Sequence, residues 1–118
     1  MSGGIVAIVD DDKAVLESLR FVLDIYGFKV MAYSMSMSFL EDRVTRPACV
    51  IVDQNMPGMN GLELVARLRQ EGNLVPVLLT TGMPTTGIAA HAERLGIERV
   101  VAKPAELDEF LSFVGKYC

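Results

Sequence analysis

The sequence contains no tryptophan, one histidine and only two cysteines in 118 residues. The two cysteines, Cys49 and Cys118, lack the close spacing of metal ligands, and we expect two reduced thiols, not a disulfide. The histidine, His91, has no serine or cysteine partner in its part of the sequence, so we interpret it as a surface residue. Cysteine-bound metals and histidine-activated nucleophiles are therefore poor explanations of this chain.

The chain also lacks long apolar runs, a surplus of positive charge and a glycine-rich phosphate loop. No apolar run approaches the roughly 20 residues that a membrane-spanning helix needs, and residues 1–4 do not resemble a signal peptide. With a net charge of −4, direct binding to DNA or RNA is not expected. The missing loop after the first predicted strand counts against nucleotide binding. We expect a cytoplasmic protein with neither a membrane nor a nucleic acid as a direct partner.

What the chain does contain is the composition of an ordinary globular domain. Hydrophobic residues make up 51% and charged residues 22%, which favours a packed core over disorder. Internal repeats and linker-like segments are not found. We therefore expect one domain over residues 1–118.

Short apolar segments alternate with amphipathic segments of helical periodicity along the whole chain. This alternation predicts a parallel sheet with right-handed crossovers and helices on both faces. The expected fold is a doubly wound, flavodoxin-like α/β fold, (βα)5, with five parallel strands in the order 2-1-3-4-5. The strands are predicted at residues 4–9, 28–33, 50–52, 75–80 and 100–102.

The third predicted strand leads directly into a carboxylate. Residues 50–52 are apolar, Asp53 follows, and the turn residues Pro57, Gly58 and Gly61 come next. A strand buried on both faces would bring Asp53 to the carboxyl edge of the sheet, where open α/β folds bind their ligands. We interpret Asp53 as a nucleophile that accepts a phosphoryl group.

Two further carboxylates, Asp10 and Asp11, lie at the end of the first predicted strand. In the expected order this strand is adjacent to the third, so both aspartates would lie near Asp53. Three carboxylates in one place repel one another, and a hard divalent cation with oxygen ligands, Mg²⁺, is the simplest compensation. The alternative is that these aspartates only cap the following helix, and for Asp12 this alternative is the better interpretation.

The last two strands also end in groups that suit a phosphate. Thr81 could donate a hydrogen bond to a phosphoryl oxygen, whereas Thr80 is adequately explained as a β-branched strand residue. Lys103 could offset phosphate charge as a point cation, although a single lysine at such a position is more commonly a solvated surface residue. Because Pro104 follows, the peptide bond between the two residues could be cis and turn the lysine inward.

Together these motifs resemble the receiver domain of bacterial two-component response regulators, in the single-domain, chemotaxis-regulator-like form. The resemblance covers residues 4 to 117, and although no single motif is decisive, the motifs in this order and spacing are highly specific. The motifs that carry it are Ile8-Val9-Asp10-Asp11, the segment from Val52 to Pro57 with Gly61, Leu79-Thr80-Thr81-Gly82, and Lys103-Pro104.

The resemblance implies a phosphorylation-dependent switch, not a conventional enzyme, although the domain takes part in its own phosphoryl transfer and autodephosphorylation. Asp53 would be the phosphoacceptor, helped by Thr81 and Lys103. Asp10, Asp11, Asp53 and the backbone carbonyl of Asn55 would hold Mg²⁺. The donor would be a sensor histidine kinase or a histidine phosphotransfer protein. The fourth and fifth helices with the fifth strand would contact an output domain or target protein, and a phosphorylation-dependent homodimer is also compatible with the family.

Two positions depart from the family pattern. Receivers commonly carry Tyr or Phe three residues before the lysine, as a switch that reports phosphorylation, and here that residue is Val100. The aromatic residue that commonly follows Lys-Pro is replaced by Ala105. We therefore expect the signal to be read through backbone motion of the Gly82–Gly87 loop.

Two alternative functions fit parts of the sequence. The first is a receiver-like docking module that does not use its phosphorylation site, which the absent switch aromatic favours. The second is an aspartate-nucleophile phosphatase. Such enzymes need a second acid two residues after the nucleophile, and this chain has Asn55 there.

Overall fold

The computed structural model describes residues 3–118. Strands and helices alternate from the first element to the last, as the sequence predicted. The elements are β1 (Ile5–Val9), α1 (Lys13–Ile25), β2 (Lys29–Tyr33), α2 (Ser36–Glu41), β3 (Cys49–Asp53), α3 (Gly61–Gln70), β4 (Val77–Thr81), α4 (Thr86–Arg94), β5 (Arg99–Ala102) and α5 (Leu107–Tyr117).

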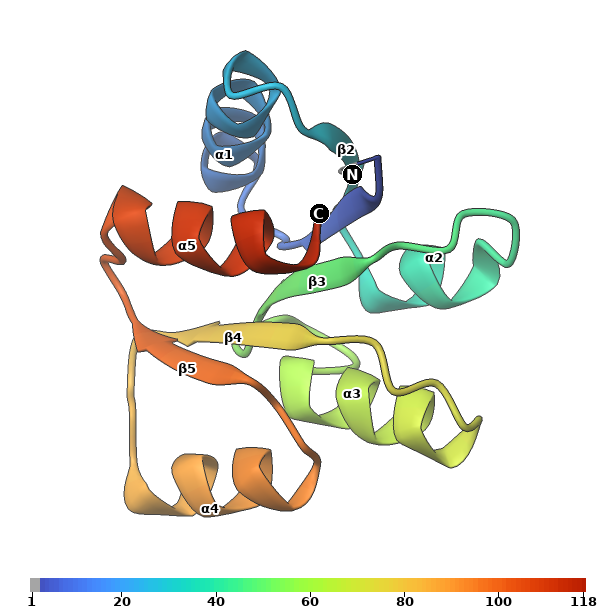
Figure 1. Ribbon diagram of the computed structural model, residues 1–118. Helices are drawn as coiled ribbons and strands as arrows, with labels where there is room; N and C mark the ends of the chain where they lie inside the picture. Colours follow the sequence, from blue (N-terminus) through green and yellow to red (C-terminus); the bar gives the residue numbers. More distant parts are fainter. Residues whose placement is uncertain (1–2) are drawn as a thin grey trace.

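The strands form one parallel five-stranded sheet in the order β2-β1-β3-β4-β5. Helices α1 and α5 cover one face of this sheet, and α2, α3 and α4 cover the other (Figure 1). This is the doubly wound, flavodoxin-like arrangement that the alternation of segments predicted, and the prediction is confirmed. Strands β1 and β3 are neighbours, so their carboxyl ends meet at one edge of the sheet.

A separate apolar layer lies on each face of the sheet. On the α1 and α5 side, Leu23 and Phe113 are almost completely buried against alternate residues of β1 and β3. On the other side, Leu64 and Val65 of α3 pack on the remaining residues of the same strands. Every residue of β3 is buried, which explains why that strand reads as a continuous apolar run rather than an alternating one.

Two predicted boundaries in the fourth strand and helix are corrected by the structure. Strand β4 spans Val77–Thr81 instead of residues 75–80, so Thr81 belongs to the strand. Helix α4 begins at Thr86, inside the Gly82–Gly87 segment that we expected to be a loop. The reason is a local cap: the Thr85 hydroxyl oxygen accepts a hydrogen bond of 3.1 Å from the Ile88 amide, which compensates for Gly87 in the first turn.

Helices α1 and α3, which follow the strands that carry the aspartates, are capped by side chains. Asp12 accepts hydrogen bonds from the amides of Ala14 and Val15, which confirms its interpretation as the cap of α1. Asn60 and Glu63 form a reciprocal capping box at the start of α3. These caps determine where α1 and α3 begin, and so they hold the loops that connect β1 to α1 and β3 to α3.

The Tyr33 hydroxyl donates a hydrogen bond of 2.6 Å to Asp42 after the end of α2. This bond lowers the pKa of Asp42 from 3.8 to about 2, while burial and the same carboxylate raise the pKa of Tyr33 to about 12. Because the pKa of Asp42 is lower in the folded chain, the contribution to stability is present above about pH 4 and disappears as the pH falls through 2. We predict that Tyr33→Phe destabilises the chain at pH 7 and that this difference shrinks toward pH 2. Urea titrations of both proteins across this pH range would measure the difference in unfolding free energy. A difference that does not change with pH would contradict the role of the Tyr33–Asp42 hydrogen bond.

The two cysteines are free, as predicted, although their sulfur atoms lie 3.4 Å apart. Burial is the main reason that the pKa of both thiols is raised, so both are protonated near neutral pH.

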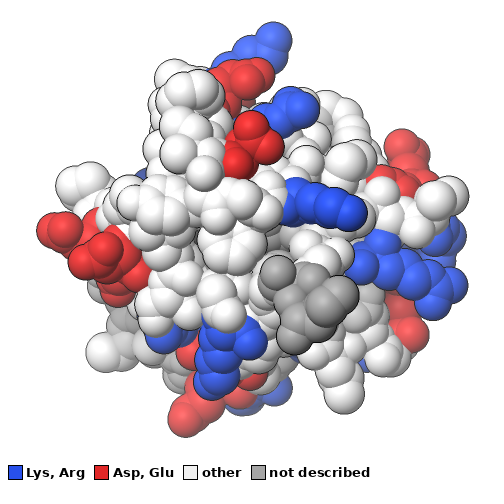
Figure 2. Space-filling model, turned by 45° about the horizontal axis from the view of Figure 1, so that its top comes forward, with Lys and Arg blue, Asp and Glu red and all other residues white. Residues whose placement is uncertain are grey.

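On the face drawn in Figure 2, acidic and basic side chains are interspersed around a broad uncharged area. That face offers no continuous basic patch for a nucleic-acid backbone. Among residues 3–118, no helix combines the length and the apolar character that a membrane crossing requires.

Candidate functional site

Asp53 is the last residue of β3 and lies at the carboxyl edge of the sheet. Its side chain is buried, and the residue is only 3% exposed. Parallel pairing places Asp53 opposite Thr80 of β4, and the Thr80 hydroxyl lies 3.4 Å from Asp53 Oδ1. A carboxylate this deeply buried is expensive unless charged or polar groups surround it.

Two more carboxylates lie beside Asp53, at the end of β1. Asp10 is 4% exposed and Asp11 is exposed, and one carboxylate oxygen from each of the three aspartates lies within 4.8 Å of the others. The Asp12 amide donates a hydrogen bond of 2.9 Å to Asp10 Oδ1, which holds the Asp10 carboxylate in place. The structure thus brings together the three carboxylates that the sequence predicted to be neighbours.

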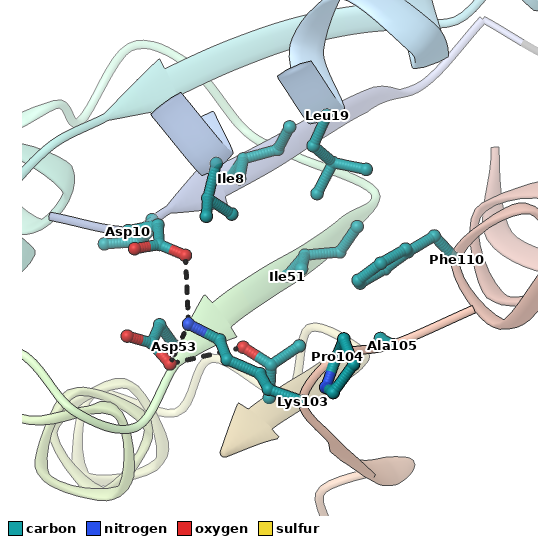
Figure 3. A pocket seen from close by; sticks show the side chains of 12 residues that line it. Ile8, Asp10, Leu19, Ile51, Asp53, Lys103, Pro104, Ala105 and Phe110 are labelled. Carbon is teal, nitrogen blue, oxygen red and sulfur yellow. Dashed lines mark hydrogen bonds and ion pairs between the residues drawn. The ribbon is translucent and has the colours of Figure 1, made fainter. Parts of the chain in front are cut away.

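Lys103 follows β5 and points into this acidic cluster (Figure 3). Its Nζ atom lies 2.9 Å from Asp53 Oδ1 and 3.7 Å from Asp10 Oδ2. The Lys103-Pro104 peptide bond is cis, as the sequence suggested. Lys103 is therefore not a solvated surface lysine but the cation of the site.

Burial and neighbouring charges shift the pKa values of Asp10 and Lys103. Burial is the largest cause that raises the pKa of Asp10, and the nearby negative charge of Asp53 adds to it. Burial alone would lower the pKa of Lys103, but its hydrogen bond to Asp53 and the charges of Asp10 and Asp53 outweigh burial, so its pKa is raised. Lys103 stays protonated at neutral pH, and one ammonium group faces three carboxylates. The site keeps an excess of negative charge.

The two threonines at the end of β4 have different surroundings from those we expected. Thr80, which we had explained as an ordinary strand residue, is the one whose hydroxyl reaches Asp53. Thr81 is fully buried, and its hydroxyl oxygen accepts a hydrogen bond of 3.1 Å from the Met83 amide. The pairing of β3 with β4 determines which threonine reaches Asp53, because Thr80 is the residue opposite Asp53. A role of Thr81 toward a phosphoryl group stays a prediction.

Gln54 is a structural residue of the site that the sequence analysis missed. It is buried, and its Oε1 atom accepts a hydrogen bond of 2.8 Å from the Leu62 amide, while its backbone carbonyl accepts one from Gly61. Gln54 therefore ties the residue after Asp53 to the start of α3. A buried polar residue with two anchors of this kind keeps the end of β3 fixed.

The donor set suits a hard divalent cation. Carboxylate oxygens are the ligands that Mg²⁺ prefers, and their separation of 4.8 Å or less allows one ion to contact more than one of them. The exposed position of Asp11 leaves room for the water ligands that Mg²⁺ usually keeps. The acidic triad of Asp10, Asp11 and Asp53 is therefore consistent with a divalent metal site.

Residues 6–114 match the family model described as "Response regulator receiver domain". The chain belongs to this family. The receiver domain accounts for the fold, for the acidic pocket at its carboxyl edge and for a place in two-component signalling.

Curated relatives support the same assignment. The receiver is 33% identical over 112 residues to "Transcriptional regulatory protein FixJ" of Bradyrhizobium diazoefficiens, covering 94% of this chain and 55% of that protein. It is also 33% identical over 112 residues to "Response regulator protein TodT" of Pseudomonas putida, covering 93% of this chain and 49% of that protein. The chain thus spans about half the length of these relatives.

Solved structures show the same fold. The receiver superimposes on the crystal structure described as FixJ-N with a TM-score of 0.89 at 29% identity, over 99% of this chain and 94% of that one. The chemotaxis protein CheY4 of Vibrio cholerae gives a TM-score of 0.88 at 21% identity, over 99% and 100% of the two chains. The latter similarity concerns the fold alone.

The two departures from the family pattern have clear places in the structure. Val100 lies in β5, partly buried against the apolar layer of α2, α3 and α4. Ala105 follows Pro104 and is partly buried on the opposite face of the sheet, where it forms part of the wall of a cavity that also reaches Asp53. The small side chains at both positions change the packing around the site, not its charged groups.

Asp11 offers a direct test of the metal site. We predict that Asp11→Ala weakens Mg²⁺ binding by about tenfold or more, because one oxygen ligand is lost from the acidic cluster. The folded state without metal should be as stable as the parent or slightly more stable, since carboxylate repulsion is relieved. Metal titration followed by NMR and urea unfolding without metal would measure both. Clear destabilisation of the metal-free variant would show that the acidic pair is structural.

Proposed function

We propose that this receiver domain is a phosphorylation-dependent switch in which Asp53 accepts a phosphoryl group. The observation that carries the proposal is the arrangement around Asp53: a buried carboxylate within 4.8 Å of two other aspartates and 2.9 Å from the ammonium group of Lys103. A structural carboxylate would need one partner of opposite charge. The additional aspartates favour a site that collects a metal ion and a phosphate instead.

The phosphoryl donor is a phosphohistidine on a sensor kinase or a histidine phosphotransfer protein. A carboxylate oxygen of Asp53 attacks the phosphorus atom, the phosphorus–nitrogen bond breaks, and the electron pair stays with the imidazole, which then takes up a proton from solvent. The chain's contribution is to position the reacting groups in line and to neutralise charge. A bound Mg²⁺ supplies most of the positive charge that the phosphoryl oxygens require.

Each residue of the site has a separate task in this scheme. Asp10, Asp11 and the Asn55 carbonyl, together with Asp53, hold the metal ion. Lys103 contacts Asp53 before the transfer and pairs with a phosphoryl oxygen after it. Thr81 leaves its contact with the Met83 amide and donates a hydrogen bond to the phosphoryl group. Breaking that contact would move the Gly82–Gly87 segment.

The movement of this segment is our explanation of how phosphorylation is read. Val100 has no ring that could report the state of the site, so the signal would pass through the loop before α4 to the face formed by α4, β5 and α5. An output domain, a target protein or a second copy of the receiver would bind this face differently in the two states.

Incubation with acetyl phosphate and Mg²⁺ tests the proposal. The receiver should gain one phosphoryl group that is stable in acid and labile in base, and omission of Mg²⁺ should prevent the gain. Intact-mass spectrometry measures the uptake. A folded protein that takes up no phosphoryl group would favour the docking module, for which Val100 is the supporting observation. Sustained turnover of a phosphomonoester would favour the phosphatase.

A further inference from the structure

A cavity of about 430 Å³ lies on the α1 and α5 side of the sheet, directly behind the charged groups of the site. Its walls are mainly apolar and come from β1, α1, β3, α5 and the segment that leads into α5 (Figure 3). The wall residues are Ile8, Val15, Leu19, Ile51, Ala105 and Phe110. A dry apolar cavity of only about 150 Å³ is enough to bind benzene, so this one is large enough for a molecule of one or two rings.

Ala105 lines this cavity with a small side chain. Its neighbour in the chain, Pro104, also lines it, together with Ile51 of β3 and Phe110 of α5 (Figure 3). A shallower hollow of about 390 Å³ shares Val15, Leu19, Ala105 and Phe110, so the cavity opens outward between α1 and α5. A small molecule can therefore enter from the surface without unfolding any element.

One end of the cavity is polar, and its charges select the head group of a ligand. Asp10, Asp53, Thr80 and Lys103 line this end. Without a bound divalent cation, two carboxylates against one ammonium group, with Asp11 close by, give it a negative excess that disfavours an anion. A hydroxyl group fits better, because it can donate a hydrogen bond to a carboxylate without bringing a charge.

We infer that this cavity is a binding site for a small uncharged ring compound that carries a hydroxyl group. The ring packs between Phe110 and the aliphatic wall, and the hydroxyl group points to the carboxylates of Asp10 and Asp53. The polar end shares Asp10, Asp53 and Lys103 with the acidic site, but binding of the compound requires no phosphoryl group. Binding of such a compound would change the surroundings of Asp10 and Asp53, so the acidic site would respond to the concentration of the compound.

The test uses 2-naphthol as the probe and the unphosphorylated receiver without Mg²⁺. NMR titration should show saturable shifts of amides from Ile8, Ile51 and Phe110, with a dissociation constant of roughly 4 mM or tighter, as expected for a good ligand of this size. Naphthalene-2-sulfonate, which has the same rings and an anionic head, should bind about tenfold more weakly or not at all. Absence of saturable shifts with 2-naphthol, or equal affinity for the sulfonate, would overturn the inference.

Filling the cavity is the second arm of the test. Ala105→Phe should weaken binding of 2-naphthol by about tenfold or more, and Ala105→Leu should give a smaller loss in the same direction. Ala90→Phe, on the exposed side of α4 and away from the cavity, is the matched control and should bind like the parent. Amide spectra confirm that each variant is folded. Unchanged affinity in both folded Ala105 variants would contradict the site.

The ligand site and the proposed function can fail independently of each other. A receiver that binds 2-naphthol but takes up no phosphoryl group would contradict the phosphoacceptor proposal alone. Phosphorylation without binding of the probe would contradict the ligand site alone.

Discussion

Replacing Asp53 with asparagine is expected to reduce phosphoryl uptake from acetyl phosphate to the background level. Asparagine has nearly the same shape as aspartate but offers no carboxylate oxygen as a nucleophile. It also removes one charge from the acidic cluster, so the folded state should survive the change. Intact-mass spectrometry with acetyl phosphate and Mg²⁺ measures the loss.

Asp12→Asn is the matched control for this prediction. Asp12 is exposed and caps α1, and asparagine caps a helix as well as aspartate does. The control removes one negative charge two residues from Asp10, while the charges of Asp10, Asp11 and Asp53 remain. It should take up the phosphoryl group like the parent. If Asp53→Asn were labelled as fully as Asp12→Asn, another residue would be the acceptor.

Gly61→Ala is expected to have the largest effect on stability, with a loss of about 1–3 kcal/mol. A Cβ atom at this first residue of α3 would lie 2.8 Å from the Asp53 carbonyl oxygen, 3.1 Å from Gln54 Cα and 2.7 Å from Leu79 Cδ1. Two of these contacts are with the backbone at the end of β3, which cannot rotate away. The strand end and the helix would have to separate, and the position of Asp53 would change with them. Urea unfolding measures the loss.

Gly115→Ala provides the contrast within the same chain. Gly115 lies in α5, and nothing lies within 4 Å of the place where its Cβ would be. Alanine is favoured over glycine in a helix by about 0.5–1 kcal/mol, so this variant should be more stable than the parent. If both variants were equally destabilised, crowding at the end of β3 would not explain the effect of Gly61→Ala.

Much of the fold could be predicted because two signals agreed at every element. The apolar strands are short and β-branched, and each helix has an apolar face at the spacing of its turns. These signals fix the type and order of elements but not their ends. The start of α4 was missed because glycine and threonine at positions 85–87 oppose helix formation, whereas the Thr85 cap depends on the exact backbone geometry.

The candidate site was largely predictable for a topological reason. Asp53 is the last residue of an apolar strand, Asp10 and Lys103 each come directly after one, and the ends of parallel strands meet at one edge. The register between strands could not be read from the sequence, so the contact between Thr80 and Asp53 was missed. Gln54 escaped attention because its role depends on a hydrogen bond to the start of α3, which no local pattern signals.

The cavity beside the site was beyond prediction from the sequence. Alanine at position 105 was visible as a departure from the family pattern, but a small side chain leaves a space only if its neighbours do not close it. Here Ile51 and Phe110 line the space beside Ala105 and leave it open. Whether such a space remains depends on the positions of α1 and α5 on the sheet.

The central claim is that the phosphoryl group resides on Asp53. Borohydride reduction of the phosphorylated receiver converts an aspartyl phosphate to homoserine, and sequencing of proteolytic peptides by mass spectrometry then locates it. The account predicts homoserine at position 53 and at no other position, with no conversion in a sample prepared without Mg²⁺. Homoserine at position 10 or 11, or a phosphoryl group found on His91, would contradict it.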